Sequence, residues 1–191
     1  MNATDLTPRQ RRQLLRVARR AVQQAVGAPT DRASTADLPE DFTSHGAFVT
    51  LHHDGMLRGC IGTFAPSPSI LGTIREMAEA AALRDPRFRP LQAGDVEHID
   101  IEISLLTPLE PVKNIAVVEV GRHGLCISHN HHRGVLLPQV ATEHHWNRET
   151  FLDQTCIKAG LAPGTWQDPD CHIEVFEAVV VGEHDAELRV E

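Results

Sequence analysis

The chain has 191 residues and a formal net charge of −8, with 41% apolar, 23% charged and 4% aromatic residues. This composition is typical of a globular protein that buries its own core, and it excludes disordered and fibrous classes. The acidic balance argues against general nucleic-acid binding, which needs Lys and Arg to neutralise phosphates. Because no apolar run approaches a membrane span or a signal sequence, we expect a cytoplasmic protein that does not bind membranes.

The first predicted helix has a strong start signal. Thr7 is the expected N-cap, Pro8 is the first helical residue, and apolar residues recur at helical spacing until Gly27. Residues 28–45, rich in Pro, Asp, Ser and Thr, are predicted to form a loop. Basic residues also recur along the helix. They are Arg9, Arg12, Arg16, Arg19 and Arg20. A solvated helix face is the favoured interpretation of this stripe, and nucleic-acid docking is the weaker one.

A β-hairpin is predicted over residues 47–61. Two β-rich runs flank Asp54 and Gly55, a dipeptide that accepts the positive φ angles of a two-residue turn. A helix is predicted over 70–83, although Gly72 weakens it, and it should end before Pro86. Apolar and polar residues alternate over 99–105, which predicts a strand with one buried face.

The C-terminal half is predicted to contain three further strands and two helices. Short strands are expected at 124–128 and 134–137, separated by a polar turn over 129–133, and Pro138 opens a short helix. Asn147 should cap a longer helix that Gly160 closes, and a last strand is expected over 172–181. Because no βαβ unit repeats, the predicted fold class is α+β, with a mainly antiparallel sheet flanked by helices.

Cys60 is the residue with the strongest indication of chemistry. On a regular strand Arg58 and Cys60 project to the same face, so the guanidinium would favour the thiolate, the nucleophilic form. Gly59 and Gly62 remove side chains, which allows a ligand or another backbone to approach, or permits a bulge that would break the two-residue parity. The alternative is a buried, inert cysteine that serves packing. We expect Cys60 to be the most consequential of the four cysteines.

Four other residues are candidates for ligand binding. Arg84 and Arg87 offer donors suited to a carboxylate or phosphate, although local ion pairs with Asp85 are the favoured alternative. Glu102 projects from the polar face of a strand, either to pair with an arginine or, less favoured, to act as a general base. Gln139 follows a proline at a helix start, where it could satisfy backbone groups or touch a ligand.

Metal and nucleotide sites are not predicted. The twelve histidines include no HExxH or similar spacing that would fix ligands on one face, so we expect no bound metal. The four cysteines form neither a CxxC pair nor a disulfide framework. No GxxxxGK[ST], GxGxxG or GxSxG pattern is present, which excludes the corresponding NTPase, dinucleotide and serine-hydrolase geometries. No cofactor is therefore expected.

Residues 57–63 read Leu-Arg-Gly-Cys-Ile-Gly-Thr, which resembles the LRGCIG signature of the AMMECR domain family. Bacterial and archaeal members are called AmmeMemoRadiSam system protein A. Other sequence blocks match the family in the same order and extend the resemblance over nearly the whole chain. These blocks lie at 47–51, 84–88, 102–104, 136–141, 146, 151–152 and 158–161.

The resemblance implies a single domain over 1–191 with two lobes. The larger lobe would come from about 1–64 and 99–191 and the smaller central lobe from about 65–98, with LRGCIG near their junction. The family has no agreed reaction, but its system name implies a Memo-like protein and a radical SAM protein as partners. The leading hypothesis is an accessory component that binds a small molecule or a partner at LRGCIG. The alternative is a redox or covalent-transfer enzyme that uses Cys60, and a nucleic-acid adaptor is a weaker third.

Overall fold

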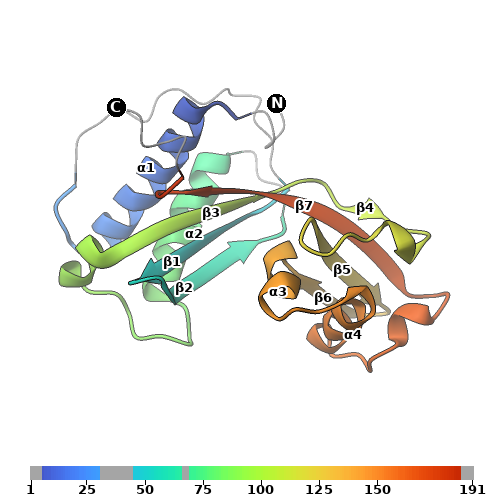
Figure 1. The fold of residues 1–191 in the computed structure, drawn as a ribbon. Coiled ribbons are helices and arrows are strands. Elements are labelled where there is room, and N and C mark those ends of the chain that lie inside the picture. The colour runs from blue at the N-terminus through green and yellow to red at the C-terminus, as the bar shows by residue number, and fades with distance from the viewer. Residues whose placement is uncertain (1–5, 31–44, 66–68, 186–191) are drawn as a thin grey trace. The chain divides into compact units, whose positions relative to one another are not determined.

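The structure, a computed structural model, describes residues 6–30, 45–65 and 69–185 (Figure 1). Contacts divide the chain into two compact units. Unit 1 contains the chain up to residue 106 and again from 179 onwards, and unit 2 contains residues 107–178. Both units are built from antiparallel strands with helices packed on them, so the predicted α+β class is confirmed.

Helix α1 (Pro8–Ala25) opens unit 1 and begins as the sequence predicts. The Thr7 hydroxyl accepts a hydrogen bond from the Gln10 amide at 3.3 Å, and the Gln10 side chain accepts one from the Thr7 amide at 2.9 Å. This capping box satisfies amides that the first turn of a helix leaves unpaired. Most of the predicted loop, residues 31–44, lies outside the described residues.

The predicted hairpin is confirmed. Strands β1 (Ala47–His53) and β2 (Met56–Thr63) pair antiparallel, and the turn residues Asp54 and Gly55 have φ angles of 51° and 76°. Strand β3 (Ile99–Leu106) pairs antiparallel with the other edge of β1. The end of strand β7 (His172–Gly182) follows β3 in the strand order, and the Glu183 amide donates to the Ile101 carbonyl at 3.1 Å.

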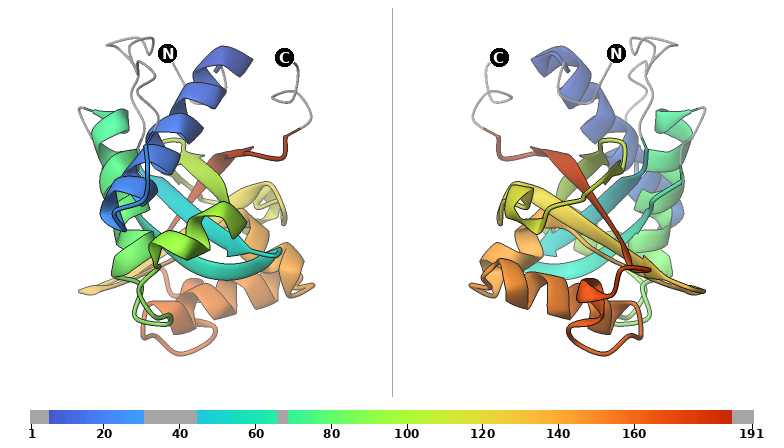
Figure 2. Two further views of the ribbon diagram at one scale, coloured as in Figure 1. Left: turned by 90° about the vertical axis from the view of Figure 1, so that its left-hand side faces the viewer. Right: turned by 90° about the vertical axis from the view of Figure 1, so that its right-hand side faces the viewer.

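Helix α2 (Ile70–Leu83) has the predicted bounds, because the Ser69 hydroxyl caps it by accepting from the Gly72 amide at 3.2 Å. It packs against α1, β1 and β2, and both helices cover one face of the unit 1 strands (Figure 2). This packing places residues 69–98 within unit 1. The smaller lobe of about 65–98 that the resemblance implies stays a prediction. The core on this face includes Leu14, Val49, Leu51, Ile74, Ile101 and Ile103.

Unit 2 is built around the hairpin of β5 (His123–His129) and β6 (His132–Leu136), with β5 also pairing antiparallel to β7 and the short β4 (Glu110–Pro111) pairing with β7. The predicted five-residue turn is wrong. Only Asn130 and His131 form the turn, because Asn130 adopts the left-handed conformation with φ 54° and lets His129 pair with His132.

Helices α3 (Pro138–Glu143) and α4 (Arg148–Lys158) complete unit 2. The predicted caps of α4 are confirmed: the Asn147 side chain accepts from the Thr150 amide at 2.9 Å, and Gly160 after the helix has φ 77°. Short 3-10 turns occur at Ala93–His98, Ile115–Val117 and Thr165–Gln167. The core of this unit includes Leu125, Ile127, Phe151, Leu152, Ile173 and Val175.

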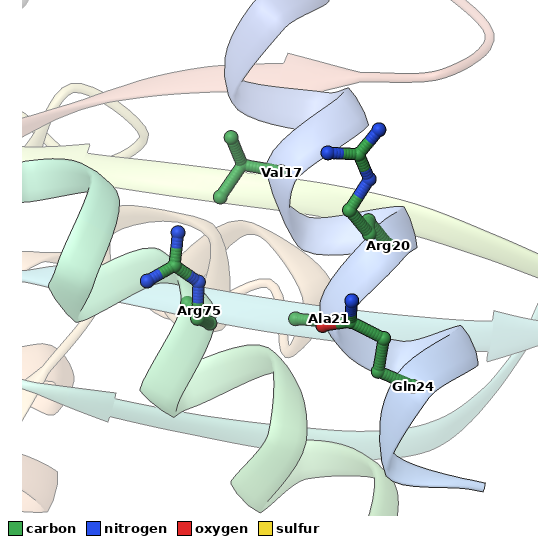
Figure 3. A pocket seen from close by; sticks show the side chains of 5 residues that line it. All are labelled: Val17, Arg20, Ala21, Gln24 and Arg75. Atoms are coloured by element: carbon green, nitrogen blue, oxygen red, sulfur yellow. The ribbon is translucent and has the colours of Figure 1, made fainter. Parts of the chain in front are cut away.

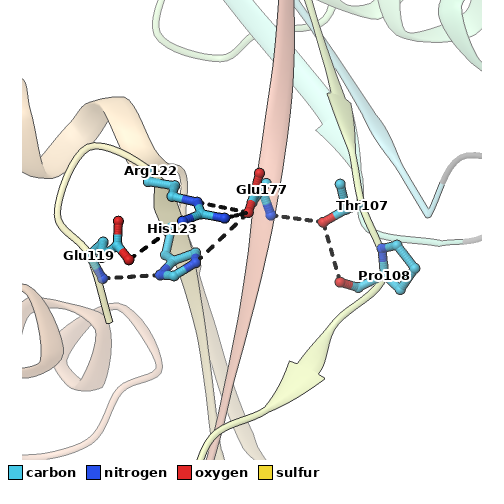
Figure 4. A network of polar contacts seen from close by, with 6 residues as sticks. All are labelled: Thr107, Pro108, Glu119, Arg122, His123 and Glu177. Atoms are coloured by element: carbon cyan, nitrogen blue, oxygen red, sulfur yellow. Dashed lines mark hydrogen bonds and ion pairs between the residues drawn. The ribbon is translucent and has the colours of Figure 1, made fainter. Parts of the chain in front are cut away.

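A polar network holds the part of β7 that belongs to unit 2 (Figure 4). The Glu177 carboxylate accepts a hydrogen bond from Arg122 Nε at 2.9 Å, and the Glu177 amide donates to Thr107 Oγ1 at 2.8 Å. The His123 ring accepts from the Glu119 amide at 3.0 Å. Arg122 and Glu177 are partly exposed, so we assign this network to strand positioning and expect a small contribution to stability.

Candidate functional site

A β-bulge at Arg58 interrupts the LRGCIG segment, residues 57–62. Leu51 lies opposite Gly59 and the next residue, His52, lies opposite Leu57, so Arg58 has no counterpart on β1. The extra residue breaks the two-residue alternation of the strand. The expectation that Arg58 shares a face with Cys60 on a regular strand is therefore not met.

The guanidinium of Arg58 lies beside an aromatic ring. Its central carbon is 5.9 Å from the centroid of the Phe88 ring, a distance suited to a cation–π contact. Its Nη2 atom is buried and has no hydrogen-bond partner in the described part of the chain. The charged groups that influence the Cys60 thiol are instead Arg87, Asp85 and Glu102.

The two glycines of the segment allow close packing within the protein. A Cβ atom on Gly59 would lie 2.3 Å from the Ala81 carbonyl oxygen of α2, and one on Gly62 would lie 2.2 Å from the Phe48 ring. Both distances are far below van der Waals contact. Gly59 thus allows the backbone of α2 to approach β2, which is one of the roles that the sequence suggests for it. At Gly62 the space is filled by the Phe48 ring.

Asp85 and Arg87 hold both backbone groups of Cys60. The Cys60 amide donates to Asp85 Oδ2 at 2.8 Å, and Arg87 Nη2 donates to the Cys60 carbonyl at 3.3 Å. The two side chains also form an ion pair, with Arg87 Nη2 at 2.7 Å and Nε at 3.0 Å from the carboxylate oxygens. Strand β2 begins the strand order, so this Asp85–Arg87 clamp satisfies groups that an edge strand leaves unpaired.

The clamp also sets the protonation of its carboxylate. Hydrogen bonds from Arg87 hold the pKa of the Asp85 carboxyl well below its usual range, against the opposing effect of burial. The Asp85 side chain is only 2% exposed, whereas the Arg87 side chain is 54% exposed. The local ion pair considered from the sequence is thus the arrangement seen for Arg87. Arg84 lies apart from the clamp, with Nη2 3.9 Å from an oxygen of the exposed Glu79.

The Cys60 thiol lies in a polar row that crosses three strands. Cys60 on β2 is opposite Thr50 on β1, which is opposite Glu102 on β3, and Thr50 Oγ1 donates to Cys60 Sγ at 3.4 Å. Burial raises the pKa of the Cys60 thiol above its ordinary value, although Thr50 and then Arg87 act in the opposite direction. The thiolate, which is the nucleophilic form, is therefore less favoured at Cys60 than at an ordinary exposed cysteine.

Among the described residues the thiol of Cys126, and not that of Cys60, accepts a hydrogen bond from an arginine side chain. Arg133 Nε donates to Cys126 Sγ at 3.2 Å, and Cys126 is fully buried. Burial raises the pKa of the Cys126 thiol, while the Arg133 contact lowers it. The two residues are diagonal neighbours across the β5–β6 hairpin, in the register that the two-residue turn at Asn130 and His131 sets.

The remaining candidates are spread over the chain. Gln139 is the second residue of α3 in unit 2, whereas the other candidate residues belong to unit 1. In the basic stripe, Arg19 forms an ion pair with Glu183 and donates to the Val96 carbonyl at 3.0 Å, so it helps to hold unit 1 together. None of the helices in the described residues is long and apolar enough to cross a membrane.

Comparison with known proteins identifies the family. The AMMECR1 family model matches residues 15–181, nearly the full length of the chain. The chain belongs to the AMMECR1 family. It is 38% identical over 190 residues to a protein of Methanothermobacter thermautotrophicus, covering 96% of this chain and 99% of that one. A Methanopyrus kandleri protein is 40% identical over 186 residues, covering 91% and 88%.

A crystal structure of an uncharacterized protein from Pyrococcus horikoshii has the same fold. Its TM-score with this AMMECR1 chain is 0.78 at 34% sequence identity, and the match covers 87% of this chain and 88% of that one. This similarity supports the predicted fold class independently of the strand and helix patterns. It also extends across both units of the AMMECR1 chain.

We expect Cys60 of this AMMECR1 chain to titrate above about 8.5, the ordinary value for cysteine, because burial disfavours its thiolate. The pH dependence of iodoacetamide alkylation, mapped residue by residue, measures this pKa. Arg58→Ala should leave it unchanged, and Arg87→Ala should raise it. A pKa below about 8.5 that rises in Arg58→Ala would restore the catalytic interpretation.

We also expect the purified AMMECR1 chain to hold no stoichiometric metal. Among the described residues, no group of three or more His, Cys, Asp or Glu side chains is placed to hold an ion. Elemental analysis after mild chelation is the measurement. One tightly bound zinc or iron per chain would contradict the expectation, because structural metal sites resist removal.

Proposed function

We propose that this chain is a non-catalytic binding component of a cytoplasmic system that also contains a Memo-like protein and a radical SAM protein. In this proposal a protein partner docks on β2, the strand that carries the LRGCIG segment. The observation that carries it is the exposure of two large apolar side chains at the start of this edge strand. Met56 is 75% exposed and Leu57 is 43% exposed.

The edge position of β2 supports recognition by a partner strand or an apolar surface. β2 has β1 as its only neighbour in the strand order of the described residues, so one side of its backbone faces away from the sheet. An edge strand of this kind can accept a strand from another protein through main-chain hydrogen bonds, and exposed side chains then supply specificity. The exposed side chains of Met56 and Leu57 would supply this specificity.

The Asp85–Arg87 clamp supports the same proposal because it fixes the strand before a partner arrives. It occupies both outward backbone groups of Cys60 and leaves the hairpin end of the strand, near Leu57, without this cover. A strand that is already ordered loses less conformational freedom when it binds. The clamp would thus make docking at the hairpin end more favourable and block pairing beyond it.

The state of Cys60 favours binding over catalysis. Burial raises the pKa of its thiol, and the arginine expected to activate it lies beside Phe88 instead. Both observations support a binding role over the alternative of a cysteine-dependent enzyme. Nucleic-acid docking is also weakened, since Arg19 of the basic stripe is held by Glu183.

Co-purification with the Memo-like and radical SAM proteins encoded in the same genome tests the proposal. Leu57→Asp and Met56→Asp should each reduce retention of a partner at least about tenfold, as expected for loss of a central apolar contact. Ile157→Asp is the matched control, because Ile157 is 48% exposed but lies on α4 of unit 2. Cys60→Ser should retain the partner. No retention by the parent chain, or equal loss in the control, would refute the proposal.

A further inference from the structure

The solvent-facing side of helix α1 is densely basic. The buried residues of α1 lie on one side of the helix, and the five arginines of the basic stripe, none of which is buried, recur at helical spacing on the other side. The helix contains no acidic residue, although the chain as a whole has a net charge of −8. The stripe is therefore a local positive surface on an acidic protein.

The positive charges of the stripe do not stabilise the helix that carries them. Arg12 and Arg16 are about one turn apart, and like charges at this spacing repel each other. Arg9 lies in the first turn, close to the positive end of the helix dipole, where an acidic side chain would be favourable instead. Helix stability therefore does not account for this pattern of charge.

Two arginines of the stripe are available to a partner. Within the described part of the chain, neither Arg12 nor Arg16 forms a hydrogen bond or an ion pair. Arg16 is exposed and Arg12 is partly exposed. Arg19, by contrast, is held by Glu183, and the other two members of the stripe also have interactions within the chain. Arg12 and Arg16 are thus the members whose charges the chain leaves uncompensated.

Arg75 of α2 extends the positive surface beyond α1. Its side chain lies beside Arg20 and Gln24, where the two helices meet (Figure 3). Arg75 is exposed and, among the described residues, has no hydrogen bond or ion pair. It therefore adds a further uncompensated guanidinium group to those of Arg12 and Arg16.

We propose that this basic surface docks an acidic segment of a protein partner, at a place distinct from β2. Carboxylates match guanidinium groups, because the planar donors of arginine form paired, charge-assisted hydrogen bonds with them. Arg12 and Arg16 present such donors about one helical turn apart, so successive carboxylates of one segment can reach both. This docking goes beyond the proposed function, which needs only the edge of β2.

A protein segment fits this surface better than a membrane or a nucleic acid does. None of the large apolar side chains exposed in the described residues belongs to α1, so the helix has nothing to insert into a bilayer. Nor does α1 contain an aromatic residue on which an unpaired base could stack. A rigid duplex would also meet the exposed acidic side chains of α2, Glu76 and Glu79, whereas a flexible segment would avoid them.

Fluorescence anisotropy of the full chain with a labelled poly-L-glutamate peptide as long as α1 tests the proposal. The peptide should bind saturably at an ionic strength of about 0.15 M and more weakly at about 1 M, because salt screens exposed charges. Arg12→Gln and Arg16→Gln should each weaken this binding about threefold, as expected for loss of one exposed ion pair, and the double variant should weaken it about tenfold.

Lys113→Gln is the matched control. Lys113 is exposed, belongs to unit 2 and has no hydrogen bond or ion pair among the described residues, so this variant removes one uncompensated charge that is not on α1. It should bind the peptide as the parent does, and melting temperatures should show that all variants fold.

Four results would each overturn the proposal. They are no binding of the peptide, normal binding by the double variant, equal weakening by Lys113→Gln and Arg16→Gln, and tighter binding of a labelled DNA duplex of the same length. The last result would assign the surface to nucleic acid. None of these results bears on partner docking at β2, so the two proposals can fail separately.

Discussion

Asp85→Ala is expected to lower the free energy of unfolding by about 3 kcal/mol, the sum of two losses. The Cys60 amide would lose its acceptor at 2.8 Å, and Arg87 would lose the carboxylate that orients it. Because Arg87 is half exposed, solvent would compensate part of its loss, so the estimate stays below that for a fully buried pair. For a chain of this size the melting temperature should fall by about 6–12 °C.

Glu79→Ala is the control for this prediction. Glu79 also lies near an arginine, but its contact with Arg84 is 3.9 Å long and exposed, so its removal should cost less than about 0.5 kcal/mol. Thermal or denaturant unfolding monitored by circular dichroism measures both variants. Equal effects of the two substitutions would show that the Asp85–Arg87 clamp contributes no more than an exposed ion pair.

The effect of Asp85 should also depend on pH, and the sign follows from the direction of its pKa shift. Its carboxyl has a lower pKa in the folded chain than in the unfolded chain, where the value is about 3.9. The stabilisation is therefore complete above about pH 4 and is lost as the pH falls through the folded-state pKa. The stability difference between the parent and Asp85→Asn should be constant near neutral pH and shrink in acid. A difference independent of pH would contradict this assignment.

Gly59→Ala is expected to cost about 3 kcal/mol, at the upper end of the usual range for overpacking. The added Cβ would lie 2.3 Å from the Ala81 carbonyl oxygen. That oxygen belongs to the backbone of α2 and cannot rotate away as a side-chain end can, so the helix and β2 must separate. The displacement should also weaken the Asp85–Arg87 clamp, because the next residue is Cys60.

Gly94→Ala provides the matched control. A Cβ on Gly94 would meet no atom within 4 Å, and the residue does not require a positive φ angle, so this variant should be neutral or slightly stabilising. Unfolding by urea compares the two variants. If Gly59→Ala proves as stable as the parent, the close contact between β2 and α2 does not limit stability, and the glycine of the LRGCIG segment needs another explanation.

The sequence predicted most elements because their signals are local. The capping residues Thr7 and Asn147 mark where helices begin, and the Asp54–Gly55 turn marks the β1–β2 hairpin. These signals act between residues a few positions apart. The β5–β6 turn is shorter than its polar composition predicts, because Asn130 adopts the left-handed conformation and lets His129 pair with His132. This register makes Arg133 and Cys126 diagonal neighbours and allows the contact between them.

For this protein the sequence alone determined the family and the α+β class. Only the tertiary structure decided what the residues of the LRGCIG segment do. A one-residue bulge directs Arg58 to Phe88, and a turn 25 residues further along the chain supplies Asp85 to the Cys60 amide. Neither contact follows from local periodicity, because both depend on how α2 and the turn after it return to the edge of β2. Burial, which also comes from tertiary packing, then raises the pKa of the Cys60 thiol.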